Sequence, residues 1–342
     1  EELVEDLLGR VQEARFVILA GPSGSGKSSV ARAGLFHALR QGRIEGSEKW
    51  LLATMSPKEK PIEGLAGAMM RLTGTPATGK HIRDEGLGNP LALHEQAEAL
   101  LSDNPEQRLV LLVDQFEELF TQTKDTEERE AFIKLLTEAA GAEAGASVGR
   151  TIVILALRSD FVSNCALSPE LRAQINREKQ FRLVGAMGPR DLAKAITLPS
   201  MEVGTEIEPA LVKQIIDDMK GEPGALPLMS FALRDLFEAE KTKPGQPMDM
   251  LLQEYLDRGG IDEALERHAD AVFESFTDEQ KDLARSIFSK LITVGEGRLD
   301  TRRTAVFADL VPAGEDAEAV AEVVNQLAAA NVRLVTTSGV EE

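Results

Sequence analysis

The stretch Gly21-Pro22-Ser23-Gly24-Ser25-Gly26-Lys27-Ser28-Ser29 decides the fold of this chain. It matches the P-loop pattern G-x-x-x-x-G-K-[ST], in which glycine-rich backbone turns successive N–H groups toward an anion. We expect Lys27 to contact the β and γ phosphates of a nucleotide and the Ser28 hydroxyl to hold Mg²⁺. The alternative is a Gly/Ser-rich turn that binds nothing.

The residues on both sides of this stretch supply the context that the motif requires. The apolar run 15–20 is typical of a buried parallel strand, and residues 27–39 have the periodicity of a helix. The apolar stripe of that helix consists of Val30, Leu35, Ala38 and Leu39. A helix beginning at Lys27 directs the positive end of its dipole at the phosphates. Strand, loop and helix together predict a phosphate-binding site.

A second apolar run, 108–113, ends in the acidic segment Asp114-Gln115-Phe116-Glu117-Glu118. A strand that delivers an Asp at its carboxyl end is the Walker B arrangement, in which the carboxylate binds Mg²⁺ directly or through a water. Ligands of open α/β sheets bind at this edge, so Asp114 and Lys27 are expected to converge. Glu117 and Glu118 are candidates for polarising an attacking water. The alternative for all three is an acidic helix start.

Arg158 follows the apolar run 151–157 and is the third candidate. A cation at the tip of that strand could sense the γ-phosphate. A surface arginine paired with Asp160 is the alternative on spacing alone.

The order of the elements predicts an α/β fold. Five predicted strands alternate with helices, which gives a parallel, doubly wound sheet. The predicted strands are 15–20, 50–55, 108–113, 151–157 and 180–184, and the helices between and before them are 1–14, 27–39, 62–72, 91–101 and 126–140. Residues 73–90 are predicted as a surface loop because of their glycines and prolines. From 188 onward the pattern is mainly helical, with short strands of a winged-helix-like module expected in 299–310 and 332–337.

The composition excludes several other classes of protein. A net charge of −19 argues against nonspecific binding of nucleic-acid phosphates. The single cysteine, Cys165, rules out an intrachain disulfide and suits a reducing cytosol, so we expect a cytoplasmic protein. The four histidines lack metal-ligand spacing. The longest apolar runs have strand length, so we expect neither a membrane helix nor a signal peptide.

The sequence resembles the STAND class of signal-transduction P-loop NTPases, in particular the family called novel STAND NTPase 1. The resemblance covers nearly the whole chain. It rests on the P-loop and on the segments Val113–Phe120, Ala156–Phe161, Gly221–Leu228, Tyr255–Gly260 and Thr301–Arg303.

The resemblance implies a P-loop NTPase core with sheet order 5-1-4-3-2, an α-helical domain and a winged-helix-like domain. We place these at 1–187, 188–250 and 251–342, the last truncated at its C-terminus. Gly224–Pro227 resembles the GxP motif, whose proline, here Pro227, packs on adenine. Arg158 falls at the sensor-arginine position. Asp114–Glu118 is similar to the Asp-Gly-x-Asp-Glu pattern of NACHT relatives and departs from the simple Walker B, so the base stays open between Glu117 and Glu118.

The function that the resemblance implies is a nucleotide-gated switch with slow Mg²⁺-dependent ATP hydrolysis. ADP would lock the domains onto the core, and exchange for ATP–Mg²⁺ would release them and permit homo-oligomerisation. Such proteins carry an N-terminal effector and a C-terminal repeat sensor, so we expect the central module of a bacterial signalling or antiphage, cell-death defence protein.

Two other functions compete with this interpretation. Guanylate kinases have a very similar Gly-Pro-Ser-Gly-Ser-Gly-Lys-Ser run, but their arginine- and tyrosine-rich GMP site has no counterpart after residue 30, where Tyr255 is the only tyrosine. A scaffold that binds nucleotide without hydrolysing it is the other alternative. Intact Lys27, Ser28 and Asp114 weigh against it.

Overall fold

The computed structural model of the chain divides into two compact units. The first unit is made mainly of Glu1–Gly188, and the second of Pro189–Lys220 and Pro227–Thr337. The residues that the structure describes are 2–22, 24–104, 106–141, 149–185, 187–202, 204–219, 225–241, 249–293, 301–302, 305–312, 314, 316–329, 332, 334 and 335.

The first unit is built around a five-stranded parallel sheet with the order β2-β3-β4-β1-β5, which confirms the predicted order 5-1-4-3-2. Its strands are β1 Phe16–Gly21, β2 Leu51–Met55, β3 Leu109–Val113, β4 Thr151–Arg158 and β5 Phe181–Leu183. Gly21 lies beside Arg158 in the register of β1 and β4. All five strands therefore direct their carboxyl ends at one edge.

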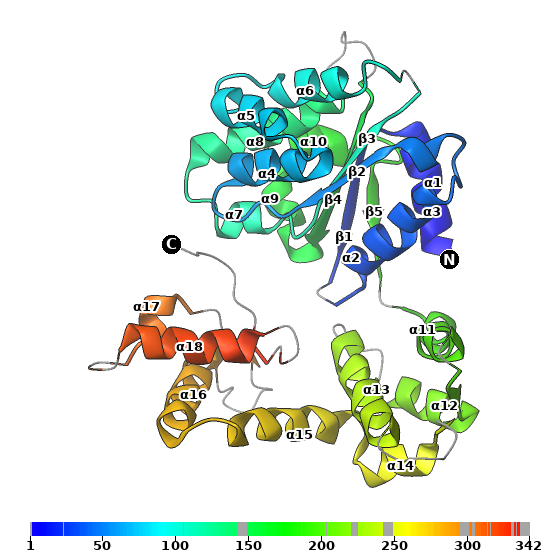
Figure 1. Cartoon of the computed structure of the whole chain (residues 1–342), viewed down its shortest axis with the longest axis vertical. Coiled ribbons are helices and arrows are strands. Elements are labelled where there is room, and N and C mark those ends of the chain that lie inside the picture. The colour runs from blue at the N-terminus through cyan, green and yellow to red at the C-terminus, as the bar shows by residue number, and fades with distance from the viewer. Residues whose placement is uncertain are drawn as a thin grey trace. The chain divides into compact units, whose positions relative to one another are not determined.

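Helices cover both faces of this sheet (Figure 1). One face packs on α4 Pro61–Thr73, α5 Pro76–Glu85, α6 Ala92–Leu100, α8 Thr126–Ala139 and α10 Pro169–Ile175. The other packs on α1 Glu2–Glu13 and on the helix that follows the P-loop. Neighbouring strand residues point to opposite faces, so Leu109 and Leu111 join the first core and Val110 and Leu112 the second. This two-sided burial explains why the strands are continuous apolar runs.

The helix after the P-loop is not uniformly α-helical. It consists of α2 Lys27–Ser29, the π-helical stretch Val30–Phe36 and α3 His37–Arg40. π-helical turns are rare and occur frequently at functional sites. The predicted helix over 27–39 is confirmed, and the sequence did not indicate its π-helical part.

The prediction of a loop over 73–90 is wrong, because helix α5 occupies Pro76–Glu85. Pro76 stands in the first turn, where a missing N–H costs nothing, and Ile82 is fully buried. Gly79 is needed for packing rather than for a turn, since a Cβ there would lie 2.5 Å from the Ala66 carbonyl oxygen of α4. A glycine that permits close helix contact looks the same in the sequence as one that breaks a helix.

The second unit is mainly helical, as the sequence predicts. Its helices are α11 Pro189–Glu202, α12 Pro209–Asp218, α13 Ala225–Lys241, α14 Leu252–Asp257, α15 Gly260–Glu274, α16 Asp278–Leu291, α17 Phe307–Leu310 and α18 Ala317–Ala328. Two-residue strands pair as β6 Glu206–Ile207 with β7 Asp249–Met250 and as β8 Ile292–Thr293 with β9 Thr301–Arg302. The strand predicted in 332–337 lies largely outside the described residues. No helix among the described residues is long and apolar enough to cross a membrane.

Candidate functional site

The P-loop connects the end of β1 to the start of α2, as the motif requires. Gly24 and Gly26 have φ angles of 72° and 83°, a left-handed backbone that side chains with a Cβ rarely adopt. The Ser25 N–H donates to the Pro22 carbonyl at 3.2 Å, which closes the turn. The sequence's glycines therefore stand where the backbone conformation demands them.

The Lys27 ammonium lies over this loop. Its Nζ donates to the carbonyl oxygens of Gly21 at 2.9 Å and Pro22 at 2.8 Å. Burial lowers the pKa of Lys27 below its usual value, while the charges of Glu117 and Asp114 oppose that shift. A partly desolvated cation held by loop carbonyls is well placed to exchange those contacts for phosphate oxygens.

Ser28 and Asp114, which the sequence predicts as metal ligands, are brought into contact. The Ser28 hydroxyl donates to Asp114 Oδ1 at 2.7 Å, across 86 residues of sequence. Adjacent ligands of an octahedral Mg²⁺ are about 2.9 Å apart when each bond is about 2.0–2.1 Å. The pair thus fits two neighbouring positions of such a site, and among the described residues no cluster of three His, Cys, Asp or Glu offers another. Phosphates and waters would complete the shell.

Backbone contacts hold Asp114 in place at the end of β3. Its N–H donates to the Met55 carbonyl of β2 at 2.8 Å, and its Oδ1 accepts the N–H of Gln115 at 3.0 Å. Gln115 has a φ of 53°, and the next residue, Phe116, donates to the Ala156 carbonyl of β4 at 2.9 Å. The acidic loop is therefore pinned to both neighbouring strands.

The structure separates the two glutamates that the sequence left equivalent. Glu117 Oε2 accepts the backbone N–H of Arg158 at 3.2 Å, and Lys27 and Arg158 are the cations that act on its charge. Burial raises the pKa of Glu117, and these cations partly oppose the shift. Glu117 is thus electrostatically coupled to the P-loop lysine.

Glu118 lies in a different environment. Burial raises its pKa too, but the cation that acts on it is Lys58 rather than Lys27. Its Oε2 is buried, and the side chain of the buried Gln122 interacts with it and partly opposes the shift. Glu118 therefore belongs to a polar niche in α7, Glu118–Thr121, and in the loop after it.

Arg158 adopts the surface pairing that was the alternative to a sensor role. Its Nε and Nη2 donate to the two oxygens of Asp160 at 3.1 and 2.6 Å, and both side chains are about half exposed. Burial raises the pKa of Asp160, but the hydrogen bonds and charge of Arg158, a backbone hydrogen bond and the charge of Lys27 together lower the pKa overall. The sensor role stays a prediction.

The remaining predicted residues fall into two groups. Pro22, Ser25 and Ser29 lie in or beside the loop, and the buried Ser25 has its Oγ 3.4 Å from Lys27 Nζ. Ser23 lies outside the described residues, and Pro227 lies in the first turn of α13 with its side chain outside them. The adenine contact of Pro227 therefore stays a prediction.

Sequence reasoning missed Arg32, which lies in the π-helical stretch four residues after Ser28. Its Nη2 forms an ion pair with Asp114 Oδ2 at 2.9 Å. The i, i+4 spacing from Ser28 was the available signal, since it puts both side chains on one face of a helix.

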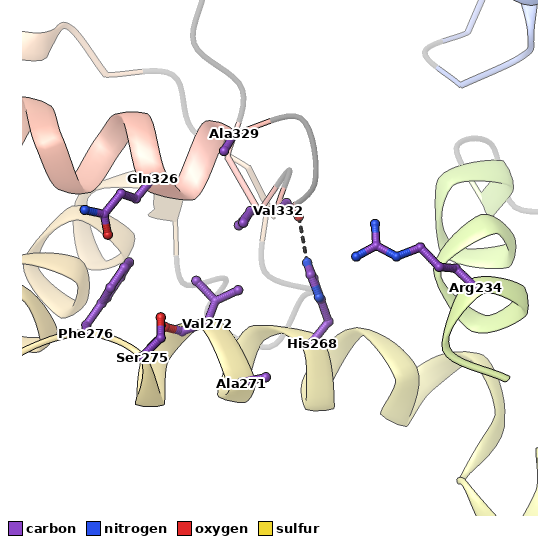
Figure 2. Close-up of a pocket in the computed structure, with 9 residues that line it drawn as sticks. All are labelled: Arg234, His268, Ala271, Val272, Ser275, Phe276, Gln326, Ala329 and Val332. Atoms are coloured by element: carbon purple, nitrogen blue, oxygen red, sulfur yellow. Dashed lines mark hydrogen bonds between the residues drawn. The ribbon is translucent and has the colours of Figure 1, made fainter. Parts of the chain in front are cut away.

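A cavity of about 450 Å³ lies in the second unit (Figure 2). Figure 2 shows His268 of α15 directed at the Val332 carbonyl, to which its Nε2 is 2.9 Å. The lining is Arg234, His268, Ala271, Val272, Ser275, Phe276, Gln326, Ala329 and Val332. The described residues that line it include no carboxylate and none of the predicted site residues, so the P-loop remains the candidate site.

The fold and the site define a P-loop NTPase. More narrowly, the chain belongs to the family Novel STAND NTPase 1, whose sequence model matches residues 1–341. No curated protein sequence matches the chain.

Two solved structures of the Aeropyrum pernix ORC2 protein are similar in fold. The one with ADPNP and ADP has a TM-score of 0.52 at 14% identity, covering 99% of this chain and 81% of that one. The ADP form has a TM-score of 0.51 at 16% identity, covering 96% and 93%. At this identity the likeness concerns the fold alone.

Proposed function

We propose that this chain is an ATP/ADP-binding switch that hydrolyses ATP slowly with Mg²⁺. The observation that carries the proposal is the Ser28–Asp114 contact at 2.7 Å beside Lys27, at the carboxyl edge of the sheet. These groups correspond to the lysine and the metal ligands that bind a nucleoside triphosphate in P-loop proteins. Binding of ADP by the ORC2 protein of similar fold is further support.

The hydrolysis step is a transfer of the γ-phosphoryl group to water. In this proposal Glu117 accepts a proton from the attacking water, a P–O bond forms, and the bond to the β–γ bridging oxygen breaks to leave ADP and phosphate. Lys27 offsets charge on the β and γ phosphates, and a bound Mg²⁺ would neutralise developing negative charge. Glu118, whose charge interacts with Lys58, would be structural.

The switch itself needs contacts that differ between the ATP and ADP states. Arg158 is suited to this, because its ion-pair partner is the half-exposed Asp160, which it could exchange for a γ-phosphate. Family membership supports a place in a bacterial signalling or defence protein, with effector and sensor domains and oligomerisation as output.

Calorimetry with ADP and ATP tests the binding part of the proposal. The chain should bind both, and Lys27→Ala should weaken binding by about 100-fold or more, because it removes a charge-assisted contact to phosphate. Melting temperature without nucleotide serves as the control for folding. Equal affinity in the two proteins would refute the assignment, and phosphate transfer to added GMP would favour the kinase alternative.

A further inference from the structure

Arg32 is a charged side chain at the candidate site to which the proposed function gives no role. It extends from the π-helical stretch to Asp114 Oδ2, with an Nη2–Oδ2 distance of 2.9 Å. The Arg32 side chain is 53% exposed, whereas that of Asp114 is 6% exposed. One partner of this ion pair is therefore desolvated and the other is free to move into water.

The two carboxylate oxygens of Asp114 have separate partners. Oδ1 accepts the Ser28 hydroxyl and the Gln115 N–H, both neutral donors. Oδ2 forms an ion pair with the guanidinium of Arg32. Lys27 Nζ instead donates hydrogen bonds to the carbonyl oxygens of Gly21 and Pro22. Among the described residues, Arg32 is thus the cation that is directly paired with Asp114.

A buried carboxylate is costly unless a cation compensates it. A Mg²⁺ ion bound with a nucleotide would compensate this charge, and Ser28 and Asp114 would hold it. Without Mg²⁺ the same compensation must come from the protein, and the 2.9 Å ion pair supplies it. The two cations therefore perform the same electrostatic task in different states.

We propose that Arg32 is the built-in counter-ion of Asp114 in the metal-free state, and that it allows the protein to retain ADP with little dependence on Mg²⁺. This inference rests on the proposed nucleotide-binding function. Removing Arg32 destabilises the metal-free state more than the Mg²⁺-bound state, in which the metal already compensates Asp114. The dependence of ADP affinity on Mg²⁺ must then increase.

The test compares four proteins: wild type, Arg32→Gln, Arg32→Lys and Arg43→Ala. Arg43 is the matched control, since it too is 53% exposed and ion-paired, but with the exposed Glu5. The dissociation constant of a fluorescent ADP analogue is measured in EDTA and in millimolar Mg²⁺. We expect the ratio of the two constants to be below about tenfold in the wild type and at least about tenfold larger in Arg32→Gln. In Arg32→Lys and Arg43→Ala the ratio of the two constants should be close to that of the wild type.

Two results of this titration would overturn the proposal. An equal loss of affinity in EDTA and in Mg²⁺ would mean that Arg32 only supports the local fold. A ratio in Arg32→Lys as large as in Arg32→Gln would mean that the positive charge is not what matters. In either case ADP binding by the wild type would leave the proposed function standing.

Thermal unfolding without nucleotide separates failure of this inference from failure of the proposed function. Arg32→Gln should melt about 2–4 °C lower than wild type in EDTA, because the buried Asp114 carboxylate has lost its counter-ion. In the Asp114→Asn background the same substitution should leave the melting temperature unchanged, because residue 114 no longer carries a charge that needs compensation. Absence of ADP binding by the wild type would refute the proposed function. The melting assay still tests the counter-ion role of Arg32, and an unchanged melting temperature in Arg32→Gln would refute that role.

Discussion

The two units of this molecule are stabilised in different ways. In the first, all residues of β1 and β3 are buried, and apolar clusters lie on both faces of the sheet. In the second, strands are two residues long and the helices bury one face each, for example Val320, Val323 and Leu327 of α18. Polar contacts between distant residues, such as Tyr255 Oη donating to Asp218 at 2.7 Å, supplement that smaller core.

The difference shows where a nucleotide site can be built. The candidate charges stand on short loops at the ends of β1, β3 and β4, and these strands are fixed by burial on both sides. Such a scaffold holds ligand groups to within small tolerances, while the loops keep them at the surface. The second unit, with short strands and polar contacts, suits a part that changes conformation.

The largest expected effect is the destabilisation of the first unit by a substitution in its core, with the core of the second unit unchanged. Leu111→Ala removes a fully buried side chain from the centre of β3 and should lower the free energy of unfolding by about 2–5 kcal/mol. Leu327→Ala, at 1% exposed in α18, is the matched change in the second unit. Hydrogen exchange followed by segment should show that each variant loosens its own unit. Equal loosening of both units would mean that they unfold as one body.

The second prediction concerns the two glutamates of the first unit. Glu117→Gln should slow single-turnover ATP hydrolysis about 100-fold, equivalent to about 2.7 kcal/mol, because it removes the proposed base. Glu118→Gln should change the rate by less than about threefold. Since burial raises the pKa of Glu117 and the carboxylate is the active form, the rate should rise with pH through that raised pKa, above the usual 4.3 or so. A larger loss in Glu118→Gln would reverse the assignment.

The third prediction concerns the ion pairs of the second unit. Asp235 accepts hydrogen bonds from Arg258 at 2.9 and 2.8 Å and from Arg267 at 2.9 Å, and all three side chains are about one-third exposed. Asp235→Asn should lower the free energy of unfolding at pH 7 by about 1 kcal/mol, a figure reduced for solvent screening.

The pH dependence of this variant gives a sharper test. Burial raises the pKa of Asp235, but the hydrogen bonds from Arg258 and Arg267 outweigh it and lower the pKa overall. A depressed folded-state pKa stabilises the protein above the unfolded value of about 3.9, and that contribution is lost as pH falls through the folded pKa. Urea midpoints of wild type and variant should therefore converge on acidification. A constant difference from pH 7 to pH 3 would exclude the charge as its cause.

The sequence alone predicted the first unit well because burial on both faces leaves a clear signal. Each of the five strands was located to within one residue at either end, and the P-loop and Asp114 were identified by their position after strands. Two-residue strands such as β6 and β8 are too short for any periodicity. They are defined by pairing with partners farther along the chain.

The features that sequence reasoning missed also depend on contacts between residues far apart in the chain. Helix α5 was hidden because Gly79 is there for contact with α4, a tertiary requirement. The role of Arg32 depends on a partner 82 positions away, and the different environments of Glu117 and Glu118 depend on which cation lies near each. Residue types and spacing indicated the chemistry of the site, but not which of the two adjacent glutamates is electrostatically coupled to Lys27.

The smallest expected effect sharpens the contrast between the units. Arg83 of α5 and Glu63 of α4 form an ion pair on the surface of the first unit, with side chains 43% and 52% exposed. Water screens such a pair, and ordering two long side chains costs entropy, so Arg83→Ala should change the free energy of unfolding by about 0.5 kcal/mol or less. Chemical denaturation in low and high salt measures this, with Asp235→Asn as the reference. If Arg83→Ala were as destabilising as Asp235→Asn, the first unit would depend on surface charge as much as the second, and the division between an apolar scaffold and a polar-supported unit would not hold.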